Sequence, residues 1–454
     1  MTSNGSPSSS RRMAVAVLNR FERDRSFPSI LEHGSFGHHL SNRERAFAHL
    51  LTMGVLQNRT LLDWVLGPIC NHPLTKLPVG ILNTLRLGAF ELLRLPDKPA
   101  PIIVNEYVSL ARLEGHKGTA SLVNAVLRKV ARVRHKVAEP DPEVGFVEWL
   151  SIRCSHPRWL VERWTREFGE EDTVRLCETN NEPPAVCLRI NPLKAGKHQV
   201  LQELEQIGMP FKESPYTENC LILNLANASD KSPRLGQLPG LAKGWYTVQD
   251  EAAQLVGLST QLLEGHTVVD ACSAPGGKTT HMASLMRNKG KVIAVDRNAG
   301  RLRTVHRNCD RLGVSIAEFH CGDFRDLARD FSSVADICLV DVPCSGTGVL
   351  RRKPDIRWQI GPQDIAELSS VQYQLLASAA NVVRPGGSLV YSTCSMEREE
   401  NHGVIELFLQ RYANYRLAPA GMPPSTVTDE GYFWCLPHRH NTDGAFAARL
   451  TRKL

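Results

Sequence analysis

The stretch HTVVDACSAPGGKTTHMASLMRNKGKVIAVD, residues 266–296, decides the fold of the second half of this chain. It places a glycine-rich turn and a helix-forming segment between two short runs rich in Val, Ile and Ala, each of a length typical of a strand. Further apolar runs follow, AEFH, ADICLVD and GSLVYS, with a helical pattern over 299–313. Strands that alternate with helices predict a doubly wound, mostly parallel sheet. Such sheets bind ligands at the carboxyl ends of their strands, so the residues at those ends are candidate site residues.

The run DACSAPGGKTT, residues 270–280, is a candidate cofactor loop. Gly276 and Gly277 have no side chain to keep a cofactor away from the backbone, and the following helix points its amide groups into the turn. A nucleoside-triphosphate loop is disfavoured because it requires a glycine where Cys272 stands. Asp296 ends the next strand, close to the spacing at which an acid binds ribose hydroxyls. The glycines and the acid alone are compatible with a dinucleotide, S-adenosylmethionine or a tight turn.

The run GDF, residues 322–324, offers another acidic group at the end of a strand. Asp323 could reach the amino group of an adenine. It could also cap the N-terminus of a following helix, because aspartate is preferred at that position. Both interpretations stay open on the sequence alone.

Two further runs are DVPCSG (341–346) and YSTCS (391–395). Each contains a cysteine at or just after the end of a strand-like apolar stretch. Carbon 5 of a pyrimidine is a poor nucleophile until a thiolate adds at carbon 6, after which it can take a methyl group from a sulfonium donor. Either Cys344 or Cys394 could attack, and the other could assist release. Asp341 could hydrogen-bond ring nitrogen 3 or the exocyclic amine of a cytosine. A single such cysteine is more often a core residue, but two beside a cofactor loop favour nucleic-acid methylation.

The chain divides into segments of different character. Residues 1–12 are expected to form a disordered leader. Residues 13–138 are expected to form an all-α bundle, because apolar residues recur there at helical spacing. A linker and bracing helix over 139–165, a small α+β unit over 166–244 and the catalytic domain over 245–454 complete the prediction.

Positive charge is concentrated in the first part of the chain. Residues 1–138 contain 19 Lys and Arg but 9 Asp and Glu, whereas the whole chain has a net charge of +7. This imbalance favours a module that binds phosphates, although a solvated basic surface is about as compatible with it. The candidate RNA contacts of this segment are Arg43, Arg45, Arg59, Arg128, Lys129, Arg132 and Arg134. In the α+β unit the candidates for phosphate contacts are Arg189, Asn191 and Lys194.

Composition argues against several classes of protein. No segment approaches the roughly 18 consecutive apolar residues of a membrane span. The 12 cysteines contain no CxxC pair, which argues against a zinc site and against a secreted disulfide framework. We therefore expect a cytoplasmic protein that has no metal, does not bind a membrane and acts as a monomer.

From Gln249 onward the chain resembles the RNA 5-methylcytosine methyltransferases of the Sun/Nol1/Nop2 family. The resemblance is carried by VQDEAAQL, DACSAPGGKTT, VIAVDRN, GDF, DVPCSGTGVLRRKPDIRW, GGSLVYSTCS and EENHGVI. The N-terminal helices resemble the transcription antitermination factor NusB through LSNRERAFAHLLTMGVLQNRTLLDWVL, LRLGAFELLRL and GTASLVNAVLRKV. The whole chain is thus similar to bacterial 16S ribosomal RNA cytosine methyltransferases, with a NusB-like bundle, a small α+β unit and a Rossmann-like catalytic domain.

The resemblance implies a role for each catalytic residue. Cys394 would be the nucleophile, and Cys344 would serve release of the methylated base. Asp341 and Lys278 would lie in the active site. The pattern of the residues alone leaves the order of the two cysteines open, because DNA cytosine methyltransferases attack with the Pro-Cys cysteine.

The resemblance also implies S-adenosylmethionine as the cofactor. Asp296 would bind its ribose, Asp323 would lie near its adenine, and Asp341 would lie near the reacting end. The loop residues that would line it are Cys272, Ser273, Ala274, Pro275, Gly276, Gly277 and Lys278.

The implied activity is methylation of carbon 5 of a cytosine in 16S ribosomal RNA. The alternatives are the same reaction on transfer RNA and a non-catalytic NusB-like RNA-binding factor, which the intact motifs disfavour. Two small departures from the family pattern, Ser273 for alanine and DGAF (443–446) for DGFF, touch no implied catalytic group. EREEN (397–401) is interpreted as a helix start, concerned with capping more than catalysis.

Overall fold

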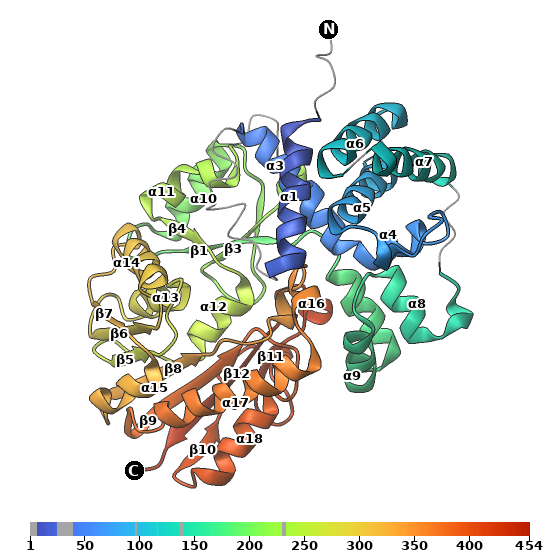
Figure 1. Ribbon diagram of the computed structural model, residues 1–454. Coiled ribbons are helices and arrows are strands. Elements are labelled where there is room, and N and C mark those ends of the chain that lie inside the picture. Colours follow the sequence, from blue (N-terminus) through green and yellow to red (C-terminus); the bar gives the residue numbers. More distant parts are fainter. Residues whose placement is uncertain (1–6, 25–39, 96–97, 116, 136–139, 229–232) are drawn as a thin grey trace. The chain divides into compact units, whose positions relative to one another are not determined.

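The structure is a computed structural model that describes residues 7–24, 40–95, 98–115, 117–135, 140–228 and 233–454 (Figure 1). Contacts divide the chain into two compact units. The first contains the residues up to Asn181 together with Lys353–Gln359, and the second contains Glu182–Arg352 and Ile360–Leu454. None of the helices in the described ranges has the length and apolar character of a membrane span.

The first unit is helical, as the apolar periodicity predicts (Figure 1). Its core is formed by side chains from several helices, among them Leu18, Leu85, Tyr107 and Leu127. The helices of the N-terminal bundle are α1 (Ser9–Asp24), α3 (Asn42–Gln57), α4 (Arg59–Leu66), α5 (Val79–Arg94), α6 (Ala100–Glu114) and α7 (Lys117–Val133).

The bundle begins earlier in the chain than the sequence suggests. Residues 9–12, which were expected in a disordered leader, form the first turn of α1. The Arg11 guanidinium pairs with the buried carboxylate of Glu91, and the Tyr107 hydroxyl donates to the same carboxylate at 3.0 Å. A charge buried in this way needs its partner, so the pair fixes the turn that carries Arg11. Residues 1–6 of the expected leader lie outside the described residues.

Two more helices, α8 (Phe146–Arg153) and α9 (Arg158–Thr179), also belong to the first unit. The boundary expected at residue 166 therefore falls inside α9, which bends at Gly169, where φ is 79°. The segment Lys353–Gln359, which contains α16 (Ile356–Gln359), belongs to the same unit.

Two side chains hold the segment Lys353–Gln359 among these helices. The buried Arg357 guanidinium donates to the carbonyl of Ser155 and to the side-chain oxygen of Asn181, both at 3.0 Å. The Trp358 indole donates to the Leu56 carbonyl at 2.7 Å. The sequence pattern does not predict this placement, because the partners lie far away along the chain.

The small α+β unit is an antiparallel sheet in the order β2-β3-β1-β4. Its strands and helices are β1 (Val186–Ile190), α10 (Lys197–Gln206), β2 (Phe211–Glu213), β3 (Cys220–Leu223), α11 (Pro239–Lys243) and β4 (Tyr246–Val248). Leu188, Val200, Leu221 and Tyr246 are buried between sheet and helices. The sequence predicts β1, β3 and α10. It does not reveal β2 and β4, because three residues are too few to show a period.

The catalytic domain is a mixed sheet in the order β10-β12-β9-β8-β5-β6-β7, with β11 paired to β12. Its strands are β5 (Thr267–Asp270), β6 (Lys291–Asp296), β7 (Ala317–Cys321), β8 (Ala335–Asp341), β9 (Val383–Thr393), β10 (Tyr415–Ala418), β11 (Phe433–Cys435) and β12 (Ala445–Arg452). Strands β5 to β9 are parallel, which confirms the predicted doubly wound core. The antiparallel strands β10, β11 and β12 extend the sheet beyond the prediction.

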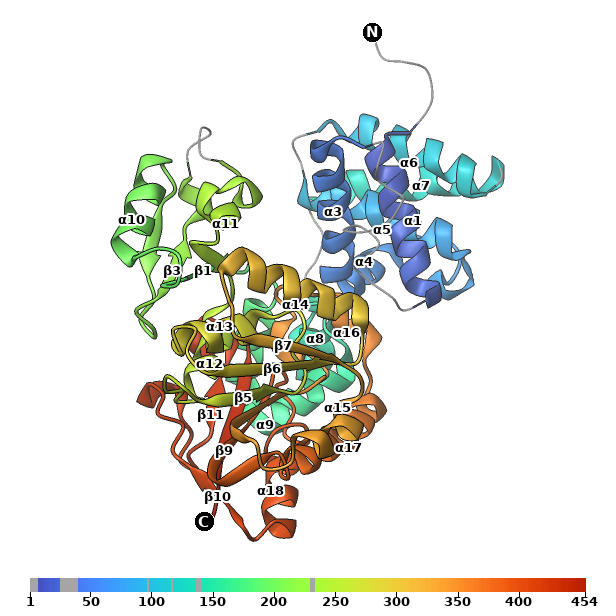
Figure 2. The ribbon, with the colours of Figure 1, turned by 90° about the vertical axis from the view of Figure 1, so that its left-hand side faces the viewer.

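Helices cover both faces of this sheet (Figure 2). Alternate residues of one strand enter two different cores: Val268 packs against α12 and α13, whereas Val269 packs on the opposite face, with α15, α17 and α18. Burial on both faces explains why the strands read as continuous apolar runs. The helices are α12 (Glu251–Leu258), α13 (Gly277–Leu285), α14 (Ala299–Leu312), α15 (Phe324–Leu327), α17 (Pro362–Ala379), α18 (His402–Arg411) and α19 (Pro437–His440).

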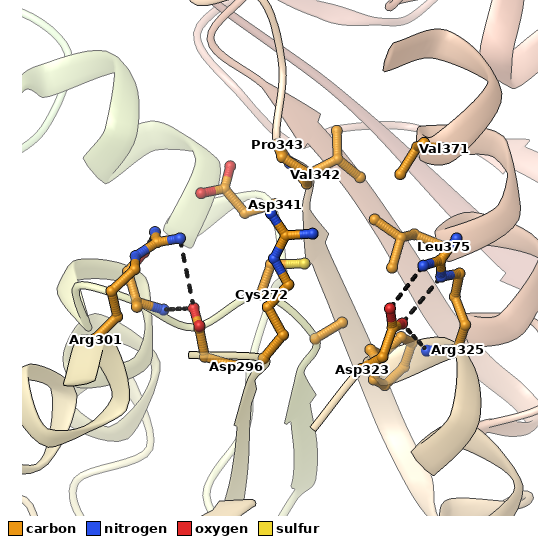
Figure 3. Close-up of a pocket in the computed structure, with 14 residues that line it drawn as sticks. Cys272, Asp296, Arg301, Asp323, Arg325, Asp341, Val342, Pro343, Val371 and Leu375 are labelled. Carbon is orange, nitrogen blue, oxygen red and sulfur yellow. Dashed lines mark hydrogen bonds and ion pairs between the residues drawn. The ribbon is translucent and has the colours of Figure 1, made fainter. Parts of the chain in front are cut away.

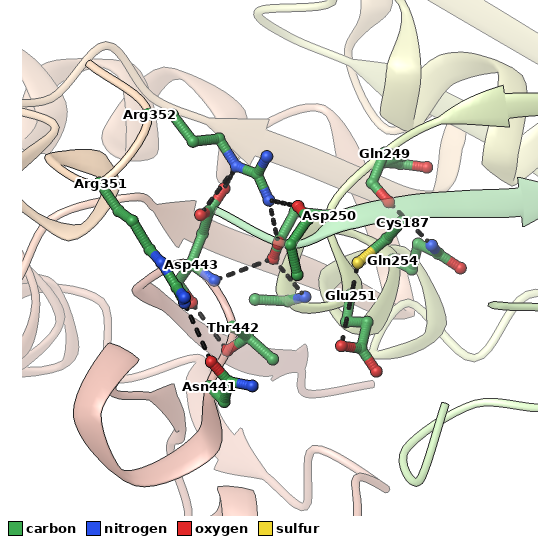
Figure 4. Close-up of polar contacts among 12 residues, drawn as sticks. Cys187, Gln249, Asp250, Glu251, Gln254, Arg351, Arg352, Asn441, Thr442 and Asp443 are labelled. Carbon is green, nitrogen blue, oxygen red and sulfur yellow. Dashed lines mark hydrogen bonds and ion pairs between the residues drawn. The ribbon is translucent and has the colours of Figure 1, made fainter. Parts of the chain in front are cut away.

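A half-buried ion cluster joins the small α+β unit to the catalytic domain (Figure 4). Arg352 donates to Asp443 at 2.6 Å, to Asp250 at 2.8 Å and to the Ala185 carbonyl at 2.9 Å. Asp250 also caps α12 by accepting from the amide of Ala252. Burial, together with the charge of Asp250, raises the pKa of Asp443 to about 7. The cluster therefore fixes the residues around Asp443 at the start of β12 to the beginning of α12.

Candidate active site

The sheet order creates the site. From β5 the chain continues to β6 and β7 on one side, and then returns to β8 and β9 on the other. The carboxyl ends of β5 and β8 therefore meet where the order reverses, which is where open α/β sheets bind ligands. A pocket lies there (Figure 3). Its lining residues are Ala271, Cys272, Ala274, Asp296, Arg297, Arg301, Asp323, Phe324, Arg325, Asp341, Val342, Pro343, Val371 and Leu375.

Five of the predicted cofactor residues line this pocket: Cys272, Ala274, Asp296, Asp323 and Asp341. The sequence missed its two arginines that lie against these acids, Arg301 and Arg325, and the apolar wall around Leu375, which comes from α17. No sequence motif marks α17, so its place at the pocket could not be predicted. The lining does not include the other predicted loop residues, Ser273, Pro275, Gly276, Gly277 and Lys278.

Contacts within the protein itself account for the two glycines of the loop. At Gly276 φ is +99°, and an added Cβ would lie 3.1 Å from the Cα of Val305 in α14. The Gly277 carbonyl accepts a hydrogen bond from Arg189 at 2.6 Å. Gly276 thus lets the loop lie against α14, a reason that differs from the close cofactor approach that the sequence suggested.

The expectation that Arg189 contacts phosphates is wrong. Its side chain is 2% exposed. Besides the Gly277 carbonyl, it binds the Thr280 hydroxyl at 2.9 Å and the side chain of Gln249. Burial, with the charge of Arg311 adding to it, lowers the pKa of Arg189 to about 9. This arginine links the small sheet to the first turn of α13 and so supports the cofactor loop.

Asn191 is also structural, because its buried amide donates to the carbonyls of Gly244 and Leu312, both at 2.8 Å. Lys194 is exposed, and its contact with phosphates stays a prediction. In the first unit, Arg59 pairs with Glu22 at 2.8 Å and lies over the ring of Trp358, which accounts for its position without RNA.

Asp296 and Asp323 are held in different ways. Asp296 accepts from the amides of Asn298 at 2.8 Å and Ala274 at 3.3 Å. Asp323 caps α15 by accepting from the Arg325 amide, and the Arg325 guanidinium binds it at 2.6 Å. The hydrogen bond from Arg325 lowers the pKa of Asp323. The capping interpretation of Asp323 is therefore confirmed, and the same residue lines the pocket.

The two cysteines lie side by side. Strands β8 and β9 pair in parallel with Asp341 opposite Ser392, so the turns that follow them leave the sheet together. The sulfur atoms of Cys344 and Cys394 are 3.2 Å apart, and the Cys394 amide donates to the Cys344 sulfur at 3.3 Å. The contact with Cys394 and burial raise the pKa of Cys344 well above its usual value.

A lysine and an aspartate complete the group. Lys278 donates to Asp341 at 2.6 Å, and the Ser392 hydroxyl donates to the other oxygen of this carboxylate at 2.7 Å. Burial alone would lower the pKa of Lys278, but Asp341, Cys394 and Asp270 outweigh it and raise the pKa. Lys278 therefore stays cationic, and it places a positive charge close to the Cys394 sulfur.

The capping interpretation of EREEN is wrong. Helix α18 starts at His402, and Asn401 at its N-cap makes no capping bond through its side chain. The side-chain nitrogen of Asn401 instead donates to the Ser395 carbonyl at 2.9 Å, and its side-chain oxygen accepts from the Thr393 hydroxyl at 2.6 Å. Glu400 is fully buried beneath the two cysteine turns. Sequence reasoning missed both residues, because their partners lie in other turns of the protein.

The described residues contain no group of three or more His, Cys, Asp and Glu side chains placed to hold a metal ion. The pocket combines hydrogen-bond-accepting carboxylates with an apolar wall of Val342, Pro343 and Leu375. This combination fits a nucleoside that carries a charged chain, as S-adenosylmethionine does. A pocket of this kind, beside two thiols at the switch point of a doubly wound sheet, is typical of an S-adenosylmethionine-dependent methyltransferase.

Comparison with known proteins identifies the family. Residues 258–451 match the family model of the 16S rRNA methyltransferase RsmB/F, residues 8–132 match the NusB family, and residues 156–229 match the ferredoxin-like domain of the RsmF/B-like methyltransferases. The chain is 34% identical to a probable ribosomal RNA small subunit methyltransferase B of Bacillus subtilis (strain 168), over 98% of each chain. The chain belongs to the family of ribosomal RNA small subunit methyltransferases B.

Solved structures agree with this assignment. The crystal structure of PH0851 is similar over 98% of this chain and 99% of the other, with a TM-score of 0.80 and 27% identity. The crystal structure of NSun6 from Pyrococcus horikoshii with SFG covers 65% of this chain and 98% of the other, with a TM-score of 0.59 and 23% identity. The second likeness supports the fold of the catalytic half.

One buried acid of the site produces a prediction about stability. Asp270 ends β5 and is 1% exposed, and it accepts from the Thr279 hydroxyl at 2.6 Å. Burial raises its pKa to about 7. An acid whose pKa is higher in the folded state lowers stability as pH rises from its unfolded value, near 4, to its folded value. We expect Asp270→Asn to be more stable than the wild type at pH 8 by up to about 4 kcal/mol, the free energy that corresponds to the difference between the two pKa values, and to lose this advantage near pH 4.

Urea unfolding at pH 4.5, 6 and 8 measures this effect. Asp326→Asn is the matched control, because Asp326 is exposed. It should leave the pH dependence unchanged. If Asp270→Asn destabilised the protein equally at all three pH values, the charge at Asp270 would be a requirement of the fold, and the prediction would be wrong.

Proposed function

We propose that this protein transfers a methyl group to carbon 5 of a cytosine in 16S ribosomal RNA through a covalent intermediate on Cys394. The observation that carries the proposal is the pair of sulfur atoms, 3.2 Å apart, beside the pocket at the ends of β8 and β9. A core cysteine needs no second thiol and no cationic neighbour. The positions of Lys278 and Asp341 around this pair support a reactive role.

The chemistry of the pair follows from these positions. The Cys394 thiolate adds to carbon 6, a carbon–sulfur bond forms, and the electron pair of the 5,6 double bond makes carbon 5 nucleophilic. S-adenosylmethionine, when bound, supplies the electrophilic methyl group. A base then takes the carbon 5 proton, the electron pair of that carbon–hydrogen bond restores the 5,6 double bond, and the carbon–sulfur bond breaks to release Cys394 as a thiolate. Cys344 lies close enough to assist this last step.

Asp341 and Lys278 orient the base and balance its charge. The Asp341 carboxylate is held by Lys278 and Ser392 and is partly exposed toward the pocket. It accepts a hydrogen bond from the exocyclic amine of the cytosine. Because both partners of the carboxylate are fixed, it needs little reorganisation when negative charge spreads into the ring during attack.

The cofactor is proposed to lie in the pocket of Figure 3, with Asp296 on the ribose and Asp323 near the adenine. Residues Cys272–Lys278 form the loop beneath it. Val342 and Leu375 supply apolar contact for a flat base. The carboxylate of Asp296 can accept from two hydroxyl groups because each of its oxygens has a free lone pair beyond its amide partner.

The substrate is proposed to be 16S ribosomal RNA rather than transfer RNA. The printed name of the Bacillus subtilis relative refers to the ribosomal small subunit, and the N-terminal helices match the NusB family. The target base has to leave its stack, which costs least in a loop. All proposed catalytic groups come from one chain, so a monomer suffices, and the cytoplasm is where such an RNA is made.

Methyl transfer to separate RNAs tests the proposal. The protein is incubated with S-adenosylmethionine that carries a labelled methyl group and with either unmodified 16S ribosomal RNA or bulk transfer RNA, followed by nucleoside analysis. Label in 5-methylcytidine from ribosomal RNA alone is the expected result. Label from transfer RNA would move the activity to that substrate, and no label from either would favour an RNA-binding factor.

For the nucleophile we expect Cys394→Ala to lose methyl transfer by more than about 1,000-fold, because the second thiol of the pair, that of Cys344, is assigned to release and not to addition at carbon 6. Binding of the RNA should remain within about threefold, since the exchange removes a single atom. Single-turnover kinetics and filter binding measure the two quantities. Turnover near the wild-type rate would exclude Cys394 as the nucleophile.

For the release step we expect the Cys344→Ala variant to accumulate a covalent adduct, in which the Cys394 sulfur is bonded to carbon 6 of the cytosine. A denaturing gel should then show a protein band shifted by the RNA, which requires S-adenosylmethionine. The double variant Cys344→Ala/Cys394→Ala is the control and should show no shift. Absence of the shifted band in the single variant would contradict the release role of Cys344.

A further inference from the structure

Glu400 lies between β9 and α18 and is fully buried. Its first carboxylate oxygen accepts from the amide of Ser345 and from the side-chain amide of Gln372, both at 2.8 Å. Its second oxygen accepts from the hydroxyls of Ser345 and Ser395. One side chain thus accepts hydrogen bonds from four donors.

The donors come from the turns that carry the two cysteines. Ser345 directly follows Cys344, and Ser395 directly follows Cys394. The two turns also bind each other directly, through the Ser345 and Ser395 hydroxyls at 3.0 Å and from the Gly348 amide to the Cys394 carbonyl at 2.9 Å. The shared carboxylate therefore ties the position of one turn to that of the other.

Helix α17 and strand β9 fix the carboxylate in turn. Gln372 of α17 donates to Glu400 and also to the Pro343 carbonyl at 3.0 Å, one residue before Cys344. The Tyr391 hydroxyl donates to the backbone carbonyl of Glu400 at 2.5 Å and to Gln372 at 3.3 Å. Gln372 and Tyr391 are both buried, so the carboxylate is anchored from two elements.

We propose that Glu400 is a positioning residue that sets the separation of the Cys344 and Cys394 sulfur atoms by binding the residue after each. This inference rests on the proposed function, in which both sulfurs must act on one cytosine. The attacking sulfur must reach carbon 6 while the other remains near carbon 5. A displacement of about 1 Å in such a pair is enough to cost about 100-fold in rate.

Glu400→Gln tests the proposal with a side chain of the same size. An amide has one oxygen and one nitrogen, so at least two of the four donors lose their acceptor. We expect kcat for methyl transfer to fall about 10-fold or more, while KM for RNA and for S-adenosylmethionine stays within about threefold. The exposed neighbour offers a matched control, and Glu399→Gln should behave as the wild type.

A second readout reports the sulfur separation without any RNA chemistry. Diamide, an azo oxidant, takes two electrons and two protons from a pair of thiols, so a disulfide forms and the azo group becomes a hydrazine. Formation requires closely placed, well oriented sulfurs. Peptide mapping of the Cys344–Cys394 disulfide should give a rate in Glu400→Gln at least about fivefold lower than in the wild type and in Glu399→Gln.

The outcomes separate the two proposals. Wild-type values of both kcat and oxidation rate in Glu400→Gln would overturn the positioning role. If oxidation is slower in Glu400→Gln but Cys394→Ala keeps full activity, the positioning role is supported and the proposed covalent mechanism is wrong. If Glu400→Gln does not fold, Ser345→Ala and Ser395→Ala each remove one donor and should slow both measurements in part. Unchanged values in both serine variants would overturn the role.

Discussion

The parallel pairing of β8 with β9 is the constraint on which the site depends. The register places Asp341 opposite Ser392, so the chain leaves the sheet at the same level in both strands and the cysteines that follow come together. Val340 and Tyr391 are buried in one core, and Leu339 and Val390 in the other. A slip by one residue would exchange these cores, which is why the register is strongly specified. The catalytic geometry is thus a consequence of ordinary strand packing.

Hydrogen-bonded polar side chains then hold the residues at the ends of these strands in place. Lys278 and Ser392 hold the two oxygens of Asp341, and Arg189 holds the first turn of α13 from the neighbouring small sheet. Polar networks in which each member is hydrogen-bonded have few alternative arrangements, so they hold their members in place. The site therefore needs little rearrangement of its own residues, and the movable partners in the reaction are the RNA base and the cofactor.

The parts of the structure that sequence could predict share a physical property. Strands β5, β6 and β8 are buried on both faces, so they show as apolar runs, and the ends of parallel strands bring Asp296, Asp341 and the cysteines to one edge. What failed depends on contacts between distant residues. The prediction that Arg189 contacts phosphates is wrong because the sequence alone does not show that this side chain is buried. The capping predicted for EREEN is wrong because the partner of Glu400 lies in the turn after Cys344, 55 residues away along the chain. Strands β10 to β12 pair with one another and with β9, a relation that no local period encodes.

The segment Lys353–Gln359 has a consequence for how such a protein can arise. It lies in the chain between the turn of Cys344 and α17, yet Arg357 and Trp358 are bound within the helical unit. The helical unit is therefore not a module attached through a single linker, because the chain passes through it a second time. Exchange of this unit by recombination at one breakpoint would leave a buried guanidinium and an indole without acceptors. A replacement for this unit would therefore have to supply acceptors for both side chains of the returning segment.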